Sequence, residues 1–337
     1  MQPDAANCGP IAGPSGGSAW RPAAGQPHAA TSTRPGLSPS VVAGYRLGAA
    51  LACRMPRRIG EVLARLLGRI AGRLDSDRRR MVERHVRRTV DPDLVGRALR
   101  RSVDTVFASY AEYWYRSFRL PEMTPAAIEA GFTHEGYERI VAARRTGVGP
   151  IMAMPHLGSW EWAAFWLARV QHVPVSAVVE ALDPPELLAW FRSLRTSVDI
   201  DVITLGSTAG AEVIRAVRQN RAVCLPCDRH VGGVGVEVEF FGETTLLPAG
   251  PATVALRTGA ALLPIAIYDH ADGCHGVVRP AIPTERLGRL RDDVARVTQL
   301  LASEIEGLIR RSPKQWHLLQ PNWPSDLLPR PVAGSAD

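Results

Sequence analysis

Short apolar runs alternate with stretches of helical periodicity along the chain from Pro150 onward. Runs of about four to eight apolar residues indicate buried strands, and apolar residues that recur every three or four positions indicate helices. Strands are expected at residues 151–154, 175–179, 202–205, 222–225, 236–241, 262–268 and 276–278. Helices are expected at residues 185–196, 209–219, 250–258 and 287–311. This order predicts an α/β fold in which helices flank a mixed central sheet.

Amphipathic helices are expected ahead of the sheet. Between Val41 and Leu74, apolar residues recur at helical spacing while arginines occupy another face. The apolar positions are Leu63, Leu66, Leu67, Ile70 and Leu74, and the arginines are Arg65, Arg69 and Arg73. No stretch reaches the roughly 18 uncharged apolar residues that a membrane-spanning helix needs. These helices therefore lie in a membrane interface or pack on the domain behind them, and one helix can do both.

The composition divides the chain into four segments. Residues 1–40 are rich in Gly, Pro, Ser, Ala and Thr, and we expect a disordered tail without a secretory signal. Residues 41–130 are expected to form a helical, membrane-associating part, residues 131–326 an α/β core, and residues 327–337 a flexible tail. With neither a signal peptide nor a spanning helix expected, the protein is predicted to be peripheral, at the cytoplasmic face of the cell membrane.

The chain is basic, which favours negatively charged partners such as anionic lipid or nucleic acid. Lys and Arg number 40 against 33 Asp and Glu, so the net charge is +7. Many arginines gather between Asp77 and Arg101, and such a run is often no more than a solvated helical face. Because this stretch shows no helix-turn-helix pattern, zinc spacing or stacking platform, we do not expect nucleic acid as a partner. We favour a surface that meets anionic membrane lipids.

The candidate chemistry lies where the first buried strand ends. The run 151–154 stops at Pro155, His156 follows, and Glu161 comes five residues later. Ser159 is a good N-cap for the helix that comes next, so Glu161 can point back toward His156. A carboxylate bonded to one imidazole nitrogen raises the basicity of the other, which can then take a proton from a hydroxyl. Taken alone, the pair is also explained by a satisfied turn histidine and a solvated glutamate.

The segment His156-Leu-Gly-Ser-Trp-Glu-Trp-Ala resembles the His-x-Gly-Asn-Trp-Asp-x-Ala block of the bacterial lauroyl/myristoyl acyltransferases, within the glycerolipid and lipid A acyltransferase superfamily. It is most similar to the actinobacterial phosphatidylinositol mannoside acyltransferases. Ser159 replaces the family's Asn, and Glu161 replaces its Asp. Further similar segments follow the family's order, so that the resemblance extends from about residue 41 to residue 326; they are residues 109–121, 179–195, 228–252 and 313–321.

The resemblance implies a set of site residues. His156 would be the general base, and Glu161 its orienting carboxylate. A catalytic glutamate is also implied in the Val-Glu-Val-Glu block, where we prefer Glu237 over Glu239, although strand alternation places both on one face. Whether Glu161 or Glu237 partners the histidine stays open. The residues expected to bind substrate are Glu180, Arg195, Asp228 and Arg229, although a surface ion pair explains the first two equally well.

The implied function is transfer of a long, palmitoyl-like acyl group from acyl-CoA to a hydroxyl of a glycolipid, most specifically a mannose of phosphatidylinositol mannoside. Acyl-CoA is a donor substrate here, and we expect neither a cofactor nor a metal site. Two alternatives stay open. One is acylation of another lysophospholipid or of a lipid A-type glycolipid, and the other is a non-catalytic lipid-binding protein of the same fold. Acyl-chain length and oligomeric state are not determined by these patterns.

Aromatic residues cluster directly behind His156, and they suit either a hydrophobic core or the wall of an acyl tunnel. They are Trp160, Trp162, Phe165 and Trp166.

The segment Cys224-Leu-Pro-Cys227 matches a Cys-x-x-Cys motif, which raises redox or zinc chemistry. A redox motif should open a helix, whereas Asp228, Arg229 and several glycines follow here. Since no second cysteine pair supplies zinc ligands, we expect neither chemistry.

Overall fold

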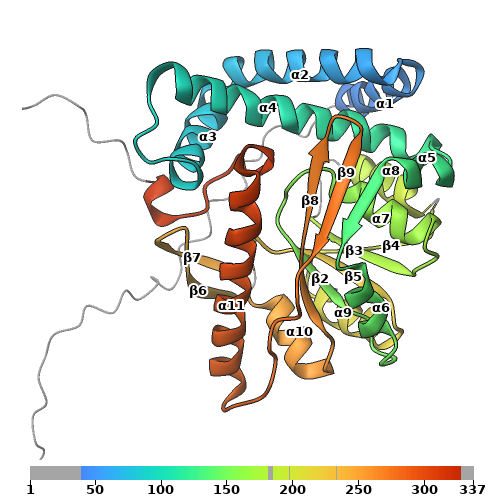
Figure 1. The fold of residues 1–337 in the computed structure, drawn as a ribbon, viewed down its shortest axis with the longest axis vertical. Helices are drawn as coiled ribbons and strands as arrows, with labels where there is room; N and C mark the ends of the chain where they lie inside the picture. Colours follow the sequence, from blue (N-terminus) through green and yellow to red (C-terminus); the bar gives the residue numbers. More distant parts are fainter. Residues whose placement is uncertain (1–38, 181–184, 197, 233, 328–337) are drawn as a thin grey trace, which may run out of the picture.

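The computed structural model describes residues 39–180, 185–196, 198–232 and 234–327. Nearly all of the two expected tails, residues 1–40 and 327–337, lies outside the described residues, so the character of these tails stays a prediction. The described chain forms a central sheet with helices on both faces and a layer of helices across one end (Figure 1). The predicted α/β class, with a mixed sheet preceded by helices, is confirmed.

Seven strands form the central sheet in the order β1-β9-β8-β2-β5-β3-β4. Their bounds are β1 (Phe132–Glu135), β2 (Ile151–Met154), β3 (Val175–Val179), β4 (Ile200–Thr204), β5 (Ala222–Pro226), β8 (Leu262–His270) and β9 (Gly273–Val278). Strand β9 runs antiparallel to β8, and the other neighbouring pairs are parallel. A separate antiparallel hairpin consists of β6 (Gly235–Phe240) and β7 (Glu243–Pro248).

The helices fall into two groups. The N-terminal group contains α1 (Pro39–Arg54), α2 (Arg57–Leu74), α3 (Ser76–Thr89) and α4 (Gly96–Arg119). The helices of the α/β part are α5 (Pro125–Ala130), α6 (Tyr137–Arg144), α7 (Trp160–Arg169), α8 (Pro185–Thr196), α9 (Ala209–Arg218), α10 (Gly250–Thr258) and α11 (Leu290–Arg311). Short 3₁₀ turns complete the order: η1 (Leu120–Glu122), η2 (Pro313–Gln315) and η3 (Pro324–Leu327).

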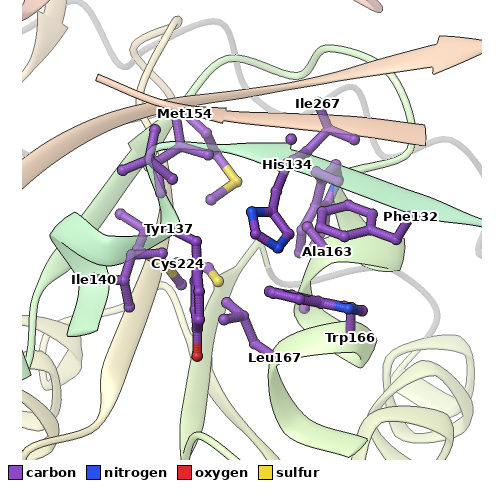
Figure 2. A pocket seen from close by; sticks show the side chains of 16 residues that line it. Phe132, His134, Tyr137, Ile140, Met154, Ala163, Trp166, Leu167, Cys224 and Ile267 are labelled. Atoms are coloured by element: carbon purple, nitrogen blue, oxygen red, sulfur yellow. The ribbon is translucent and has the colours of Figure 1, made fainter. Parts of the chain in front are cut away.

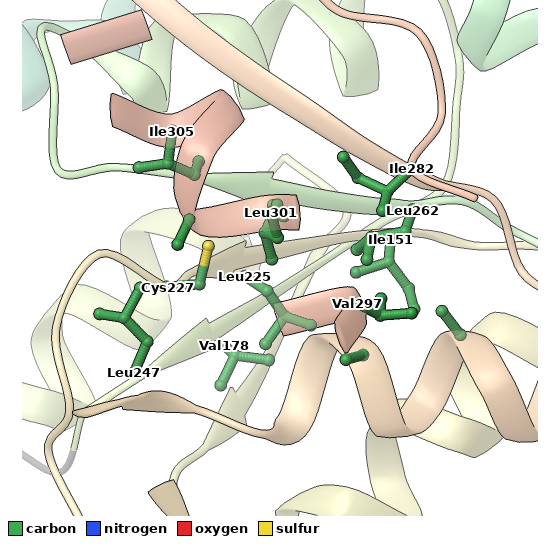
Figure 3. Packing of buried hydrophobic residues seen from close by; sticks show 14 of the residues in the cluster. Ile151, Val178, Leu225, Cys227, Leu247, Leu262, Ile282, Val297, Leu301 and Ile305 are labelled. Carbon is green, nitrogen blue, oxygen red and sulfur yellow. The ribbon is translucent and has the colours of Figure 1, made fainter. Parts of the chain in front are cut away.

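The central strands are buried on both faces, which is why they read as continuous apolar runs. Successive residues of β2 point into different cores: Met152 and Met154 pack with α7, while Ile151 and Ala153 pack with α10 and α11. Figure 2 shows part of the first core, where aromatic side chains of β1 and α7 surround a narrow space. Figure 3 shows the second, where α11 covers the strands.

Helix α2 packs closely on α4 because glycines face it. A Cβ on Gly68 would lie 2.4 Å from the Phe107 carbonyl oxygen, and a Cβ on Gly72 would lie 2.4 Å from the Phe107 ring. The opposite side of α2, together with α1, carries large apolar side chains that are exposed: Leu47, Leu51, Ile59, Val62, Leu63, Leu66, Leu67, Ile70 and Leu74. Within the described ranges, no helix combines the length and the apolarity that crossing a membrane requires.

Candidate functional site

His156 lies on the turn between β2 and α7, as the sequence predicts. Pro155 follows the strand, and Gly158 adopts a φ of +57°, a left-handed conformation that favours glycine. A Cβ at this position would lie 2.2 Å from the Ile267 carbonyl oxygen. Glycine is therefore required for the turn to pass β8 and reach Ser159, which takes the predicted N-cap position of α7 without a capping hydrogen bond from its side chain.

Asp228 is the carboxylate that contacts His156. Strands β2 and β5 are parallel neighbours with Met154 opposite Pro226, and each of the two side chains follows two residues later. The His156 Nδ1–H donates to Asp228 Oδ1 over 2.7 Å, and the His156 backbone N–H donates to Oδ2 over 3.0 Å. The Trp316 Nε1–H donates to the same Oδ2 over 2.6 Å. The Asp228 carboxylate is thus fully buried and held by three donors.

The surroundings of Asp228 keep it ionised. Burial alone would raise the pKa of its carboxyl group, but the charge of His156 and the hydrogen bonds from His156 and Trp316 lower that pKa to about 2. Because a carboxylate only accepts hydrogen bonds, the proton between the two side chains belongs to Nδ1 of His156. In neutral histidine this leaves Nε2 as the basic nitrogen.

The two glutamates predicted to partner His156 have other contacts. Glu161 is buried in α7 and forms an ion pair with Arg195 of α8. Glu237 lies on β6 and lines a different cavity. The prediction that one of them partners His156 is therefore corrected to Asp228, which we had expected to bind substrate. The sequence feature that indicates this pairing is the equal distance of His156 and Asp228 from the ends of their strands. It is informative only once the two strands are known to be adjacent.

A second histidine, which the sequence analysis did not single out, lies next to the first. The His317 backbone N–H donates to the His156 carbonyl oxygen over 2.8 Å, and the His317 Nε2 lies 3.0 Å from Ser109 Oγ. Burial, and then the nearby charge of His156, lowers the pKa of His317 to about 3. His317 is therefore a neutral polar group of the site and not a cation.

His156 and three of the predicted substrate-binding residues line one cleft of about 310 Å³. Glu180 and Arg229 form an ion pair across it, and Arg229 also donates to Gln320. Asp228 lies behind the histidine, buried away from this cleft. Among the other lining residues are Arg78, Tyr110, Tyr113, Trp114, Trp160, Leu188 and His317. The cleft thus combines a base, carboxylate and guanidinium groups, and aromatic walls.

An apolar pocket of about 40 Å³ lies behind the cleft, between α6, α7 and the strands β1, β2, β8 and β9 (Figure 2). Trp160 lines both spaces. Of the other aromatic residues behind the histidine, Trp166 lines the pocket, while Trp162 and Phe165 are buried in the same core. The aromatic cluster is therefore core and pocket wall at once.

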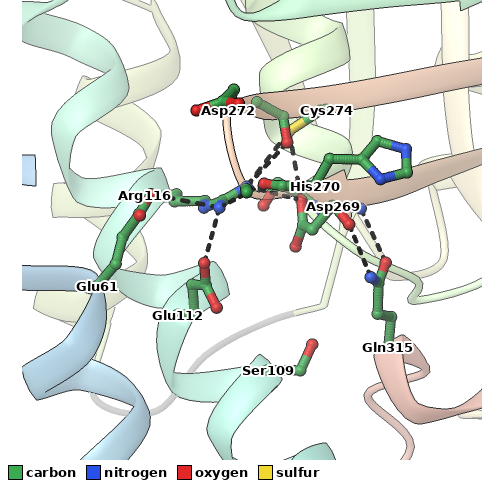
Figure 4. A network of polar contacts seen from close by, with 12 residues as sticks. Glu61, Ser109, Glu112, Arg116, Asp269, His270, Asp272, Cys274 and Gln315 are labelled. Atoms are coloured by element: carbon green, nitrogen blue, oxygen red, sulfur yellow. Dashed lines mark hydrogen bonds and ion pairs between the residues drawn. The ribbon is translucent and has the colours of Figure 1, made fainter. Parts of the chain in front are cut away.

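A polar network fixes the turn that precedes α7 (Figure 4). The Ser159 backbone N–H donates to Asp269 Oδ1 over 3.2 Å, and the Gly158 N–H donates to the Gln315 carbonyl oxygen over 3.1 Å. The Gln315 side chain also bonds the Asp269 backbone N–H and carbonyl, over 2.8 and 2.9 Å. Asp269 in turn pairs with Arg116 over 3.4 Å. The turn is thereby tied to the end of β8.

Arg116 is the buried cation of this network, with only 3% of its surface exposed. Besides Asp269, it pairs with Glu112 of its own helix over 2.7 Å and with Glu61 of α2 over 3.2 Å. Burial alone would lower the pKa of Arg116, but the carboxylates, those of Asp269 and Glu112 first, raise it, so the guanidinium stays charged. The network therefore joins α2, α4 and the end of β8 to the turn that carries the histidine.

The two residues of the Cys-x-x-Cys motif face different cores. Cys224 packs in the core with α7, and Cys227 packs in the core with α11. Burial raises the pKa of both thiols, that of Cys224 to about 12. Among the described residues, no group of three His, Cys, Asp or Glu side chains is arranged to hold a metal ion.

The chain matches the family model described as bacterial lipid A biosynthesis acyltransferase over residues 39–325. It is also similar to curated proteins named phosphatidylinositol mannoside acyltransferase. The protein from Mycolicibacterium smegmatis is 34% identical over 270 residues, which are 79% of this chain and 80% of that protein. Proteins from two strains of Mycobacterium tuberculosis are 38% identical over 224 residues, 65% of this chain and 69% of theirs.

Proposed function

The chain belongs to the family of bacterial lipid A biosynthesis acyltransferases, and from this premise we propose that it moves a long fatty acyl group from acyl-CoA to a mannose hydroxyl of a phosphatidylinositol mannoside. The acyltransferase activity follows from the family. The names of the curated relatives support the acceptor, and the donor is the one that the family resemblance implies. The observation that carries the mechanism is the 2.7 Å hydrogen bond between His156 and the ionised Asp228.

His156 is the general base of this proposal. As the acceptor oxygen attacks the thioester carbonyl carbon, the His156 Nε2 takes the hydroxyl proton, and the carbonyl oxygen becomes negatively charged. The tetrahedral intermediate then collapses, breaks the carbon–sulfur bond and releases the CoA sulfur, which receives that proton from Nε2. The products are the ester and the free thiol. Asp228 stabilises the positive imidazolium between the two steps and keeps the reactive nitrogen directed away from itself.

The cleft offers groups for both substrates. Acyl-CoA and a phosphatidylinositol headgroup carry phosphates, and the planar guanidinium binds phosphate oxygens in pairs. Arg78, Arg195 and Arg229 line the cleft beside His156. The Glu180 carboxylate, held by Arg229, can accept a hydrogen bond from a sugar hydroxyl. These residues would position the acceptor hydroxyl beside the base.

The apolar pocket behind Trp160 is the proposed slot for the acyl chain. Its lining is made of aromatic, aliphatic and sulfur-containing side chains and His134. The described lining residues include no Asp, Glu, Arg or Lys. A volume of about 40 Å³ holds little more than a water-sized group, so a long chain enters only as the lining side chains move apart. Movement of Trp160 would connect the slot to the cleft.

We propose that α1 and α2 place the cleft at a membrane. Nine exposed large apolar side chains of these two helices form a surface that lacks a partner within the described chain, and Arg58, Arg69 and Arg73 of α2 are exposed as well. Apolar residues beside arginines suit the interface of an anionic bilayer. Binding there would present a lipid acceptor to a peripheral enzyme at the cytoplasmic face of the membrane.

The test is the product formed from a panel of acceptors. The purified protein is incubated with labelled palmitoyl-CoA and with phosphatidylinositol mannoside, phosphatidylinositol, a lysophospholipid or a lipid A precursor, and products are identified by mass spectrometry. We expect an acylated mannose on the first acceptor and loss of product with His156→Ala. If only the lysophospholipid or the lipid A precursor is acylated, that lipid is the acceptor and the mannoside assignment is wrong. Equal turnover by His156→Ala would reject His156 as the base, and absence of product from every acceptor would point to a lipid-binding protein of this fold.

A further inference from the structure

A second groove, of about 530 Å³, lies beside the His156 cleft and contains polar groups that the proposed transfer does not use. The β6–β7 hairpin forms one side, and residues 321–327 form the other. The walls are tied together, because Thr245 Oγ1 donates to the Asn322 carbonyl oxygen and the Trp323 Nε1–H donates to the Phe240 carbonyl oxygen over 3.0 Å. The groove is therefore a built feature of the fold.

The groove and the cleft lie on either side of a shared wall, because residues adjacent in the chain line the two spaces. Arg229 and Gln320 line the cleft, and their chain neighbours His230 and Pro321 line the groove. The Arg229 guanidinium donates to the Gln320 side chain, so the two segments of this wall are bonded to each other. A molecule that reacts at His156 and extends past this wall would reach the groove.

Three polar side chains line the groove without a hydrogen-bond partner among the described residues. The His230 Nε2 is buried and has no hydrogen-bond partner among the described residues. The carboxylate of Glu237 and the hydroxyl of Thr244 are exposed, and no partner for either occurs in the described chain. The imidazole is held against the hairpin, since a Cβ on Gly235 would lie 3.1 Å from its Nε2.

The charge of the groove selects a neutral ligand rich in hydroxyl groups. Among the described lining residues, Glu237 is the charged one and no arginine or lysine accompanies it. A phosphate would be repelled by this carboxylate, whereas hydroxyl groups donate to carboxylates and imidazole nitrogens. Leu246 and Pro321 add apolar surface for the C–H face of a sugar ring. Carboxylate, imidazole, hydroxyl and apolar wall together suit a saccharide or another polyol.

We propose that this groove binds a sugar or polyol unit of the acceptor headgroup next to the unit that is acylated at His156. The inference rests on the proposed function, because it assumes a headgroup with more than one polyol ring. Glu237 then accepts hydrogen bonds from hydroxyl groups of the neighbouring ring, and this replaces the catalytic role expected from the sequence. The groove would make the enzyme prefer larger headgroups.

The test measures binding of the headgroup without any acyl transfer. The water-soluble, deacylated headgroup of phosphatidylinositol mannoside is titrated into wild type, Glu237→Ala and Glu239→Ala by calorimetry. Glu239 is the matched control, because it lies on the same strand and is exposed but does not line the groove. We expect Glu237→Ala to weaken binding about tenfold or more, as for loss of a hydrogen bond to a charged group. Glu239→Ala should bind as wild type does.

Two outcomes would overturn the proposal: wild type that fails to bind the headgroup, or equal affinities for wild type and Glu237→Ala. Thr244→Val serves as a second variant, with a smaller expected loss, since it removes one neutral hydroxyl. Binding that depends on Glu237 in a protein that fails to acylate the mannoside would support the groove and reject the proposed function. The two proposals therefore fail in different ways.

Discussion

His156 and Asp228 show how much of the site single residues reveal. The histidine could be predicted because an apolar run, a proline and a family block mark its position in a continuous segment. Its partner could not, because Asp228 lies 72 residues away and is brought close by pairing of β2 with β5. Glu161 is near in sequence, but α7 directs its side chain to Arg195. Local spacing predicted the base, and strand order determined its partner.

His317 gives a prediction at the same scale. Its pKa in the folded protein is about 3, against an ordinary value of 6.5, so between these values the unfolded chain binds a proton that the folded chain does not. We therefore expect the free energy of unfolding to fall as pH is lowered from 6.5 toward 3. In His317→Gln, the decrease in the free energy of unfolding over this pH range should be smaller. Urea unfolding at pH 7 and pH 4.5 measures it, and an equal fall in both proteins would contradict the assignment.

The strands were predicted with unequal success, because buried strands leave a clearer pattern in the sequence than exposed ones do. The strands at the centre of the sheet are apolar on both faces and therefore stand out in the sequence. Strand β1 was missed because it lies at the sheet edge and buries only Phe132 of its four residues. Strand β7 was missed because it belongs to a half-exposed hairpin that begins with polar residues. The groove beside that hairpin was consequently invisible in the sequence.

Helix α4 carries a prediction about the buried network. Arg116→Met leaves Asp269, Glu112 and Glu61 without their shared cation, and breaking a buried ion pair costs about 3–5 kcal/mol. We expect a loss of about 3 kcal/mol in the free energy of unfolding, measured in urea. Arg279→Met is the control, because its ion pair with Glu304 is exposed and should cost less than about 1 kcal/mol. Equal losses would show that the network does not stabilise the fold.

Helix α7 carries a prediction about acyl-chain length. Ala163 lines the apolar pocket, and Ala163→Leu would fill part of its small volume. We expect the variant to prefer shorter acyl-CoA donors than wild type does, because less of the chain fits behind Trp160. Competition between decanoyl-CoA and palmitoyl-CoA, with products quantified by mass spectrometry, measures this preference. An unchanged product ratio would place the acyl chain elsewhere.

One end of the described structure is rich in exposed apolar side chains. Helices α1 and α2 form an outer layer across the end of the sheet (Figure 1), and the network through Arg116 ties α2 to the turn that bears His156. The membrane surface proposed for these helices and the proposed reaction site therefore belong to one connected structure. The basic composition predicted contact with anionic lipid, but only the packing on α4 shows which side of α2 is free.

Binding to vesicles tests this surface. The double substitution Leu66→Asp and Ile70→Asp places two charges on the exposed side of α2, and each apolar side chain withdrawn from lipid costs about 1.5–3 kcal/mol. We expect at least about tenfold weaker co-sedimentation with phosphatidylinositol-containing vesicles. Leu287→Asp is the control, because Leu287 is also exposed and comes three residues before α11 in the chain. Helix α11 begins at the end of the molecule away from α2 (Figure 1). Equal weakening by both variants would reject α2 as the binding surface.

The central claim is that Asp228, through its hydrogen bond, makes His156 the base of acyl transfer. The most direct test is the rate of acyl transfer from palmitoyl-CoA to phosphatidylinositol mannoside by Asp228→Asn, at saturating substrate and with the fold verified by circular dichroism. Asparagine keeps the shape but removes the charge that stabilises the imidazolium, so we expect kcat to fall about 100-fold or more. A kcat within about twofold of wild type would contradict the claim.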